Sequence, residues 1–292
     1  MTGLDRQGFR YKKEMGQHFL NNALLLEQIA RYADIQAGDV VIEAGAGAGS
    51  LTSVLAASGA KVLAVELDKT LIPFLHLNFM DHTNVEIIQG DVMKMDLDAL
   101  AAGVSGTERE SYASGNGPSY KICANLPYNI SSAFITMAFR KLRGLTSGVL
   151  LLQKEVADKL TALPGEEAYG LLAIHAAWFG EVRQVMRIEP DYFTPAPSVD
   201  SALVTFRKLT RMADFDEKVL WLMIRGLFNQ RRKNLLNGLK TLAPLAPRWG
   251  LGWAEVLEKT GVDYHRRPET LSLTEFIALV KAAGYTEEHD SQ

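Results

Sequence analysis

The sequence has a single cysteine among its 292 residues and no long run of apolar residues. Cys123 alone cannot form an internal disulfide or a cysteine-rich metal site, so we expect neither. No apolar segment approaches the roughly 20 residues that a helix needs to cross a bilayer, and the basic start of the chain lacks the apolar block of a secretory signal. We therefore expect a cytoplasmic protein that does not associate with membranes.

The sequence also has little net charge, because 31 lysines and arginines are set against 34 aspartates and glutamates, which leaves −3. This balance alone argues against a nucleic-acid-binding protein, but the distribution of basic residues matters more than their sum. Basic residues cluster at the amino terminus, at Arg266 and Arg267, and at Arg231, Arg232 and Lys233. Such clusters are either solvated surface or binding sites for phosphate groups, and other residues must decide between the two.

Short β-rich runs alternate with helical runs from about residue 40. The strands are expected over "DVVIEAG", "AKVLAVEL", "VEIIQGD", "YKICANL" and "SGVLLLQ". This alternation is typical of a parallel sheet with helices on both faces. Two later runs, "EVRQVMRIE" and "SALVTFRKL", have no intervening helix and predict an antiparallel edge. The fold class is therefore α/β, Rossmann-like, with a seven-stranded and mostly parallel sheet.

Beyond about residue 209 the pattern becomes helical only, in runs such as "FDEKVLWLMIRGLF" and "SLTEFIALVKAAG". We therefore predict two domains, an α/β domain over residues 1–209 and a small all-α domain over residues 210–292. Residues 101–119, between the third and fourth strands, are rich in Gly, Ser and charge. This composition predicts a flexible surface excursion.

A glycine-rich loop follows the first strand in "VIEAGAGAGSL", with Gly45, Gly47 and Gly49 before the first helix. Glycines let the backbone approach a ligand closely, and the start of a helix offers unpaired N–H groups. A dinucleotide fingerprint requires a third glycine, where this chain has Ser50 or Thr52, depending on the register. The pattern E-x-G-x-G-x-G is instead similar to the first motif of methyltransferases that use S-adenosylmethionine, which we therefore favour over NAD.

An acidic residue stands at or just after the end of three consecutive strands: Glu43, Glu66 and Asp91. Ligands of open α/β sheets bind beyond the carboxyl ends of the strands, where these side chains should lie. Glu66 can accept hydrogen bonds from both hydroxyls of a ribose, in NAD as well as in S-adenosylmethionine. Asp91 can accept the amino group of the cofactor's adenine; its alternative role is to cap a turn.

The fourth strand ends in Asn125-Leu126-Pro127-Tyr128, which resembles the motif of methyltransferases that modify planar amino groups. The Asn125 side-chain oxygen and the Leu126 carbonyl can accept both hydrogens of an adenine amino group. This would favour the more pyramidal nitrogen of the transition state, and only interactions that strengthen there accelerate the step. Pro127 adds stiffness, and Tyr128 can stack on the base.

An adenine in a duplex or folded RNA must leave its stack, which costs a few kcal/mol, and stacking on one aromatic ring returns roughly 1–3 kcal/mol. A second ring would balance this cost. Phe193, in the proline-rich stretch "DYFTPAPSVDSAL", is our candidate for this second stacking face. The alternative is that Phe193 simply packs beneath that stretch.

Over nearly its whole length the chain resembles the KsgA/RsmA family of small-subunit ribosomal RNA adenine dimethyltransferases. The shared motifs include "GQHFLNN", "VELD", "NLPYNIS", "LLQKEVADKL", "YFTPAPSVDSALV" and "FNQRRKNLLNGL". The resemblance implies that the substrate is two neighbouring adenosines near the 3′ end of 16S rRNA, in the small ribosomal subunit or its precursor. It implies cofactor contacts at His18, Leu20, Gly45, Glu66, Asp91 and Asn125, to which the motif adds Glu43 and Gly47. It also implies phosphate contacts at Arg231, Arg232 and Lys233, no metal, and a role in subunit maturation; we expect a monomer.

This chain departs from the family at His18, where the family usually has Asn, and we expect cofactor binding to survive with altered contacts. Two alternatives from the residues remain open. Related enzymes of the macrolide-resistance type methylate 23S rRNA on the same plan, and an assembly factor could bind immature subunits without methylating them. An NAD-dependent oxidoreductase is disfavoured by Ser50.

Overall fold

The computed structural model describes residues 18–105, 119–248 and 250–286. The basic amino-terminal cluster and most of the predicted excursion at 101–119 lie outside the described residues. Residues 101–105, however, are the end of helix α4 (Leu97–Ser105). Ala101 and Ala102 are buried, and α4 packs on strands β2 and β3, so the prediction of a flexible segment is wrong for these residues.

The sheet of the described chain has seven strands in the order β4-β3-β2-β5-β6-β9-β7. Strands β2 to β6 are parallel to one another, whereas β9 is antiparallel to both β6 and β7. The predicted seven-stranded α/β architecture with an antiparallel edge is therefore confirmed. The strands are β2 (Val40–Ala44), β3 (Lys61–Glu66), β4 (Val85–Gln89), β5 (Tyr120–Asn125), β6 (Leu145–Gln153), β7 (Gly180–Ile188) and β9 (Ser201–Lys208).

The strand order reverses at β2, which pairs with β3 on one side and with β5 on the other. Glu43 lies opposite Ala64 in β3 and Cys123 in β5. The carboxyl ends of the parallel strands, β2 to β6, consequently lie along one edge of the sheet. In open α/β sheets this switch point is where ligands bind.

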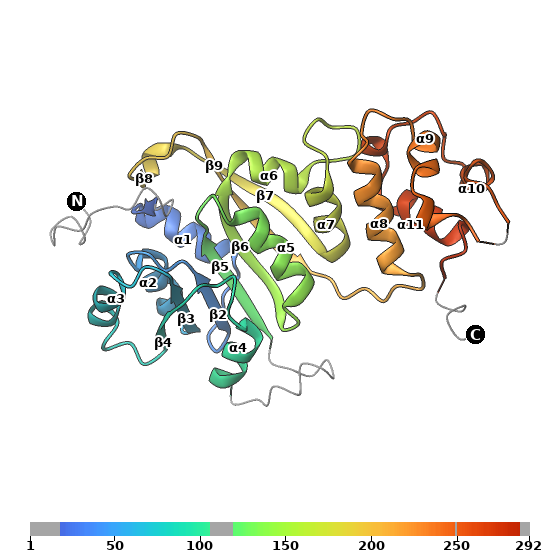
Figure 1. Ribbon diagram of the computed structural model, residues 1–292. Helices are drawn as coiled ribbons and strands as arrows, with labels where there is room; N and C mark the ends of the chain where they lie inside the picture. The colour runs from blue at the N-terminus through green and yellow to red at the C-terminus, as the bar shows by residue number, and fades with distance from the viewer. Residues whose placement is uncertain (1–17, 106–118, 249, 287–292) are drawn as a thin grey trace. The chain divides into compact units, whose positions relative to one another are not determined.

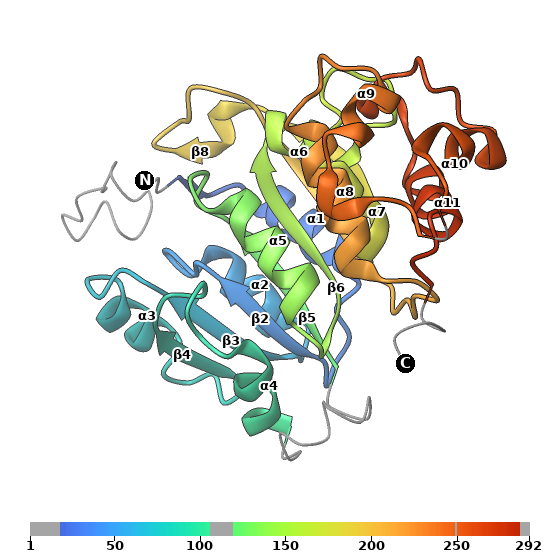
Figure 2. The ribbon, with the colours of Figure 1, turned by 45° about the vertical axis from the view of Figure 1, so that its right-hand side comes forward.

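Helices cover both faces of this sheet, which explains why its central strands are apolar at successive positions rather than alternate ones. Val41, Ile42 and Ala44 in β2, for example, are fully buried. Figures 1 and 2 show α5 in front of the strands and α1 behind them. The helices are α1 (Ala23–Tyr32), α2 (Ser50–Ala57), α3 (Ile72–Asn78), α4, α5 (Ser131–Lys141) and α6 (Lys154–Thr161).

A separate pair of very short strands joins two distant parts of the chain. Strand β1 (Phe19–Leu20) pairs antiparallel with β8 (Phe193–Thr194), and Leu20 lies opposite Phe193. A 3-10 turn (Pro190–Tyr192) precedes β8. This pairing fixes the backbone immediately after His18 beside the loop that connects β7 to β9.

The chain divides into two compact units, the first with residues 1–158 and 180–209, the second with residues 159–179 and 210–292. The helical unit thus includes residues 159–179, which precede the boundary predicted at 209 and 210. Helix α7 (Leu171–Phe179) belongs there because Ala173, Ile174 and Trp178 are part of its core. The other helices of this unit are α8 (Glu217–Phe228), α9 (Leu235–Lys240), α10 (Trp253–Thr260) and α11 (Leu273–Ala282).

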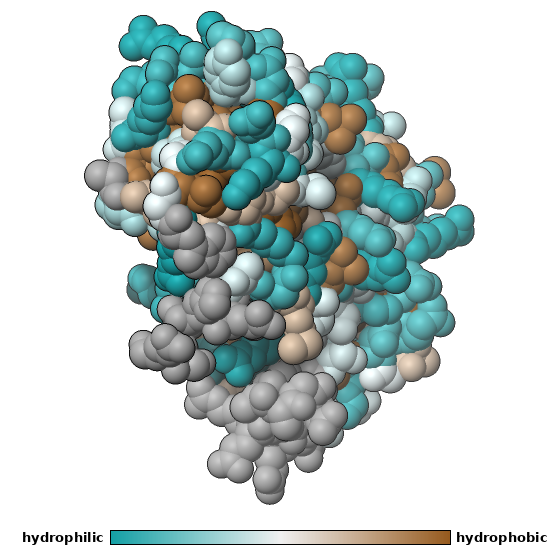
Figure 3. Space-filling view, turned by 90° about the vertical axis from the view of Figure 1, so that its right-hand side faces the viewer, coloured by the Kyte–Doolittle hydropathy of each residue, from teal (hydrophilic) through white to brown (hydrophobic). Residues whose placement is uncertain are grey.

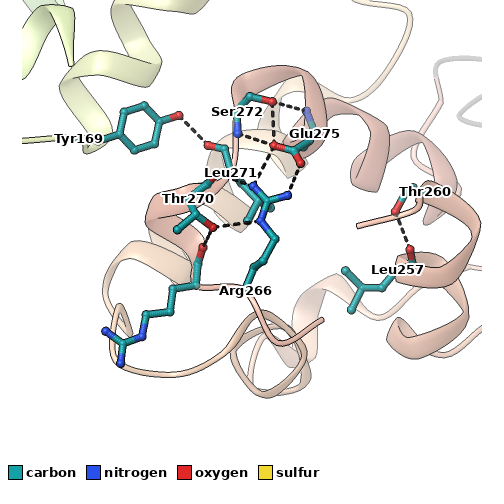
Figure 4. Close-up of polar contacts among 9 residues, drawn as sticks. Tyr169, Leu257, Thr260, Arg266, Thr270, Leu271, Ser272 and Glu275 are labelled. Atoms are coloured by element: carbon teal, nitrogen blue, oxygen red, sulfur yellow. Dashed lines mark hydrogen bonds and ion pairs between the residues drawn. The ribbon is translucent and has the colours of Figure 1, made fainter. Parts of the chain in front are cut away.

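Within the helical unit, the Arg266 guanidinium organises the loop that leads into α11 (Figure 4). It donates to the Thr270 side chain and backbone and forms an ion pair with Glu275. Glu275 also accepts from the backbone N–H of Ser272, 2.7 Å away, and completes the capping box of α11. Arg266 is therefore committed to internal contacts, although it belongs to one of the basic clusters of the sequence.

Hydrophilic side chains predominate among the described residues on the face shown in Figure 3, with apolar side chains in small groups between them. None of the helices in the described ranges is both long enough and apolar enough to cross a membrane.

Candidate active site

A cavity of about 790 Å³, including space open to solvent, lies at the switch point of the sheet. It is lined by the residues that end β2, β3 and β5, by those that follow β4, and by the segment that begins β1. Eight of the predicted site residues line this cavity: His18, Gly45, Gly47, Glu66, Asp91, Asn125, Leu126 and Tyr128. Strand pairing thus gathers side chains that are more than 100 positions apart in sequence.

The glycine loop takes a backbone conformation that larger residues rarely adopt. Gly45 has φ +83° and Gly47 has φ +57°. A Cβ atom on Gly47 would lie 2.8 Å from the Phe19 ring. The loop is anchored to β3, since the N–H groups of Gly45 and Ala46 donate to the Val65 carbonyl at 2.9 and 3.1 Å. Positive φ and close packing therefore explain the glycines, and they keep the loop backbone at the cavity wall.

Glu66 presents a fixed carboxylate at the end of β3. One of its oxygens accepts from the Gly47 N–H at 2.8 Å, and the other accepts from the Asp68 N–H at 2.7 Å. Burial raises the pKa of Glu66, and these two backbone hydrogen bonds oppose the rise. Because each carboxylate oxygen can accept more than one hydrogen bond, Glu66 can still receive the two hydroxyls of a ribose.

Asp91 follows β4 and caps its own turn, accepting from the Met93 N–H at 3.0 Å and pairing with Lys94 at 3.3 Å. It also lines the cavity, so the turn cap and the predicted ligand contact are compatible. Two apolar neighbours were missed by sequence reasoning: Leu67, which is 56% exposed, and Val92. Leu67 directly follows Glu66, and Val92 directly follows Asp91. Their places next to the two predicted carboxylates could have indicated that they contact a flat ring of the ligand.

Glu43 and Leu20 line a smaller, adjoining cavity, together with Gly45, Gly47 and Asn125. Burial raises the pKa of Glu43 to about 8; the nearby Glu66 carboxylate adds to this rise, and hydrogen bonding from Thr52 opposes it. Its Oε2 atom is buried and has no hydrogen-bond partner among the described residues. Glu43 is therefore a mostly neutral carboxylic acid beneath the glycine loop at pH 7.

The Asn125 side chain is oriented by the segment before β1. The Asn125 side-chain nitrogen lies 2.8 Å from the His18 carbonyl oxygen. Since a carbonyl can only accept, the amide must present its NH₂ group to His18. This leaves the Asn125 side-chain oxygen available as a hydrogen-bond acceptor in the cavity.

Tyr128 is held by its hydroxyl and by its ring. Its hydroxyl lies 2.8 Å from the Ser201 hydroxyl, and its ring stacks with the His18 imidazole at 5.3 Å between centroids. Burial raises the pKa of Tyr128, so the phenol stays neutral at physiological pH. Ser201 and the imidazole contact were not predicted from the sequence, because both partners are distant along the chain.

Phe193 does not lie where the sequence analysis put it. Its side chain is 4% exposed and belongs to the hydrophobic core that also contains Leu20, Ile188 and Leu203. In this conformation its ring packs in the core and not against the main cavity, and its stacking role stays a prediction. The reason for its burial is strand register, since the pairing of Leu20 with Phe193 directs both residues to the core.

The three predicted phosphate-binding residues lie in the helical unit, between α8 and α9, and all three are exposed. The Arg231 guanidinium donates to the Tyr169 carbonyl at 3.0 Å and lies 5.7 Å from the centre of the Phe228 ring. Arg232 and Lys233 have no ion pair or side-chain hydrogen bond to other residues of the described chain. These two cations are therefore the more available for an anionic partner.

The main cavity suits a nucleoside-containing cofactor. It offers a fixed carboxylate for a ribose, apolar side chains beside a second carboxylate for a flat base, and a glycine backbone for close approach. Asn125 and Leu126, the two predicted hydrogen-bond acceptors, line the same cavity. A pyrophosphate has no evident place here, because helix α2 begins at Ser50 without the third glycine of the dinucleotide fingerprint.

Comparison with known families gives a match to the model described as "Ribosomal RNA adenine dimethylase" over residues 8–279. A protein of Geobacter metallireducens named "Ribosomal RNA small subunit methyltransferase A" is 40% identical over 284 residues, which cover 94% of this chain and 96% of that protein. A protein of the same name from Pelotomaculum thermopropionicum is 37% identical over 281 residues, with 94% and 92% covered.

Two solved structures share the fold. A dimethyladenosine transferase from Plasmodium falciparum aligns with a TM-score of 0.75 at 24% identity, covering 92% of this chain and 99% of that one. The 23S rRNA methyltransferase ErmE aligns with a TM-score of 0.68 at 21% identity, covering 91% and 99%. At these identities the alignments show a common fold and do not identify the substrate.

Proposed function

The chain belongs to the ribosomal RNA adenine dimethylase family, and we propose that it uses S-adenosylmethionine to dimethylate adenine amino groups of 16S rRNA. The substrate is two adjacent adenosines near the 3′ end of that RNA, in the cytoplasmic small subunit or its precursor, and the modification contributes to subunit maturation. The observation that carries this proposal is the orientation of Asn125, whose side-chain oxygen is left free at the cavity by the hydrogen bond to the His18 carbonyl.

Asn125 and the backbone of Leu126 supply two acceptors for the two hydrogens of an adenine amino group. Such an amino group is a poor nucleophile because its lone pair is delocalised into the ring. Acceptors that favour a pyramidal nitrogen lower the barrier, since they bind more strongly in the transition state than in the ground state. The interaction is preorganised because His18 fixes the amide before the base arrives.

Glu66, Asp91, Leu67, Val92 and the loop of Gly45 and Gly47 would hold the nucleoside part of the cofactor. When bound, S-adenosylmethionine supplies an electrophilic methyl group on a sulfonium. The protein's own residues do not need to provide a strong base, because the attacking nitrogen becomes acidic as it is methylated and its proton can pass to water. Burial, reinforced by the Glu66 carboxylate, raises the pKa of Glu43 to about 8, which limits the negative charge that Glu43 adds beside Glu66 at neutral pH.

The choice of the small subunit is supported by the names of the relatives at 40% and 37% identity. The fold shared with ErmE leaves a 23S rRNA substrate as the alternative. A purely structural role in subunit assembly is disfavoured because Asn125, Glu66 and the glycine loop together form a cavity suited to chemistry.

Replacing Asn125 by alanine tests the proposed role directly. We expect the Asn125→Ala variant to lose at least about 100-fold in kcat at saturating S-adenosylmethionine, in line with the loss of one preorganised hydrogen bond in other enzymes. Incorporation of labelled methyl groups into unmethylated small subunits measures this. The control is Asn78→Ala, an exposed asparagine at the end of α3, which should retain wild-type kcat. A near-normal rate in Asn125→Ala would refute the assignment.

A further inference from the structure

The Tyr128 side chain is fixed at two points before any substrate is present. Its hydroxyl lies 2.8 Å from the Ser201 hydroxyl, and its ring is stacked with the His18 imidazole, with 27° between the ring planes. A tyrosine beyond a strand end is otherwise free to rotate about two side-chain bonds. These two contacts remove that freedom, and the side chain lines the main cavity in this fixed position.

Ser201 cannot move to follow Tyr128, because it is the first residue of β9 and is fully buried. It is paired with Gln153 in β6 on one side and with Ile188 in β7 on the other. Its hydroxyl is therefore a fixed point of the sheet. The Tyr128 hydroxyl is attached to the rigid part of the fold rather than to a loop.

His18 connects the two halves of the site through three different groups. Its carbonyl accepts from the Asn125 amide, its ring stacks on Tyr128, and its Nδ1 lies 2.7 Å from the Pro195 carbonyl. Because that carbonyl only accepts, Nδ1 must carry the hydrogen. The backbone after His18 is itself held by the pairing of β1 with β8.

We propose that His18 and Ser201 are positioning residues that hold the Tyr128 ring as a preformed stacking face for the substrate base. This inference rests on the proposed function, because it assigns Tyr128 to the base and not to the cofactor. A ring fixed in advance does not lose rotamer freedom when the base binds, so its full stacking energy is available to the complex. Phe193 is buried in the core in this structure, whereas Tyr128 lines the main cavity.

Position 18 contributes both its backbone and its side chain to the site. The family that the sequence resembles usually has asparagine there, which can offer the same backbone carbonyl to Asn125 but has no ring to stack on Tyr128. The structure thus separates the two roles of position 18. Its backbone serves Asn125, and its side chain serves Tyr128 and the loop at Pro195.

A double-mutant cycle tests the contact between Ser201 and Tyr128. We expect Ser201→Ala and Tyr128→Phe each to lower kcat/KM for unmethylated small subunits about tenfold, and the double variant to lose no more than about twofold beyond either. The Kd for S-adenosylmethionine, measured by calorimetry, should stay within about twofold of wild type. The control is Thr205→Val, which removes a hydroxyl from the same strand and should leave kcat/KM unchanged.

Two substitutions of His18 test the ring contact, and they remain informative if Ser201→Ala fails to fold. His18→Phe keeps a ring for Tyr128, whereas His18→Asn removes it. We expect His18→Phe to retain several-fold more kcat/KM for RNA than His18→Asn, with similar cofactor affinity in both. Stacking, not the Nδ1 hydrogen bond, then accounts for the larger share of the effect.

The inference would be overturned if the losses in kcat/KM of the two single variants multiplied in the double variant. It would also be overturned if the His18 variants lowered cofactor affinity as much as kcat/KM. Equal kcat/KM in His18→Phe and His18→Asn would overturn it as well. These results are distinct from failure of the proposed function, in which the wild-type protein itself would not methylate adenosines. An active wild-type enzyme with unaffected variants contradicts only the positioning role.

Discussion

Glu43 and Glu66 are two acidic side chains at the ends of neighbouring strands, and burial raises the pKa of both. They differ in their contacts, since Glu66 accepts two backbone N–H groups while the buried Oε2 of Glu43 accepts none from the described residues. The sequence predicted both acids from their place at strand ends. It could not predict which groups oppose the rise in pKa, which are Thr52 for Glu43 and the backbone of Asp68 and Gly47 for Glu66, because these contacts depend on the folded loops.

Replacing Glu43 by glutamine should change the pH dependence of stability. Its pKa is 4.5 in the unfolded chain and about 8 in the folded one, so the folded state binds more protons between these values. Ionisation of the unfolded chain above pH 4.5 therefore destabilises the native protein progressively up to about pH 8, by at most roughly 5 kcal/mol. Below pH 4.5 both states are protonated and the effect vanishes.

We thus expect Glu43→Gln to gain stability relative to wild type between pH 5 and pH 8, by a few kcal/mol in the free energy of unfolding. Urea unfolding at several pH values measures this. Glu86→Gln, the same change at an exposed position of β4, is the control and should show no such trend. A stability difference that does not vary with pH would contradict the protonated state of buried Glu43.

Most of the sheet could be predicted from the sequence, because strands and helices alternate in short runs that can each be recognised locally. The elements that were missed have physical reasons. Helix α7 is apolar on all sides, as "LLAIHAAWF", so it has no amphipathic stripe to reveal it. Strands β1 and β8 have two residues each and are joined only in three dimensions. The burial of Phe193 escaped prediction for the same reason, since its register with Leu20 is not a local property.

Strand β6 contains a glycine that no sequence pattern singled out. A Cβ atom on Gly148 would lie 2.2 Å from the Ile122 carbonyl oxygen in β5 and 2.8 Å from the Phe206 ring in β9. The backbone of a central strand cannot move far enough to relieve this overlap. We expect Gly148→Ala to lower the free energy of unfolding by about 3 kcal/mol or more.

The matched control for that change is Gly103→Ala in helix α4, where a Cβ atom would meet nothing within 4 Å. There alanine should stabilise by about 0.5–1 kcal/mol, because it favours the helix more than glycine does. Urea unfolding of both variants measures the two effects. Equal changes in the two variants would show that close packing at Gly148 does not limit the sheet.

At the scale of the whole molecule, the proposed active site and the basic cluster between α8 and α9 belong to different units. The proposed reaction belongs to the sheet unit, where the cavity lies, whereas the available cations Arg232 and Lys233 belong to the helical unit. The net charge of −3 gave no hint of an RNA partner, but the cluster between α8 and α9 did. The sequence could not distinguish Arg231, which is tied to Tyr169, from its two neighbours.

Charge removal in the helical unit should therefore change RNA binding alone. We expect the Arg232→Gln, Lys233→Gln double variant to reduce the slope of log K against log salt by roughly 1–2, because each phosphate contact contributes just under one to the slope. Anisotropy titrations with labelled small-subunit RNA at several salt concentrations measure it, and cofactor affinity should not change. Lys259→Gln, at an exposed position of α10, is the control. An unchanged slope in the double variant would exclude phosphate contacts by these two residues.

Mapping the modified nucleosides tests the central claim most directly. Small subunits lacking methylation are incubated with the protein and S-adenosylmethionine, and the digested RNA is examined by mass spectrometry together with 23S rRNA treated in the same way. The account predicts dimethylation of the amino nitrogen on two adjacent adenosines near the 3′ end of 16S rRNA. Methyl groups on ring nitrogens, on other bases, or on 23S rRNA alone would contradict it.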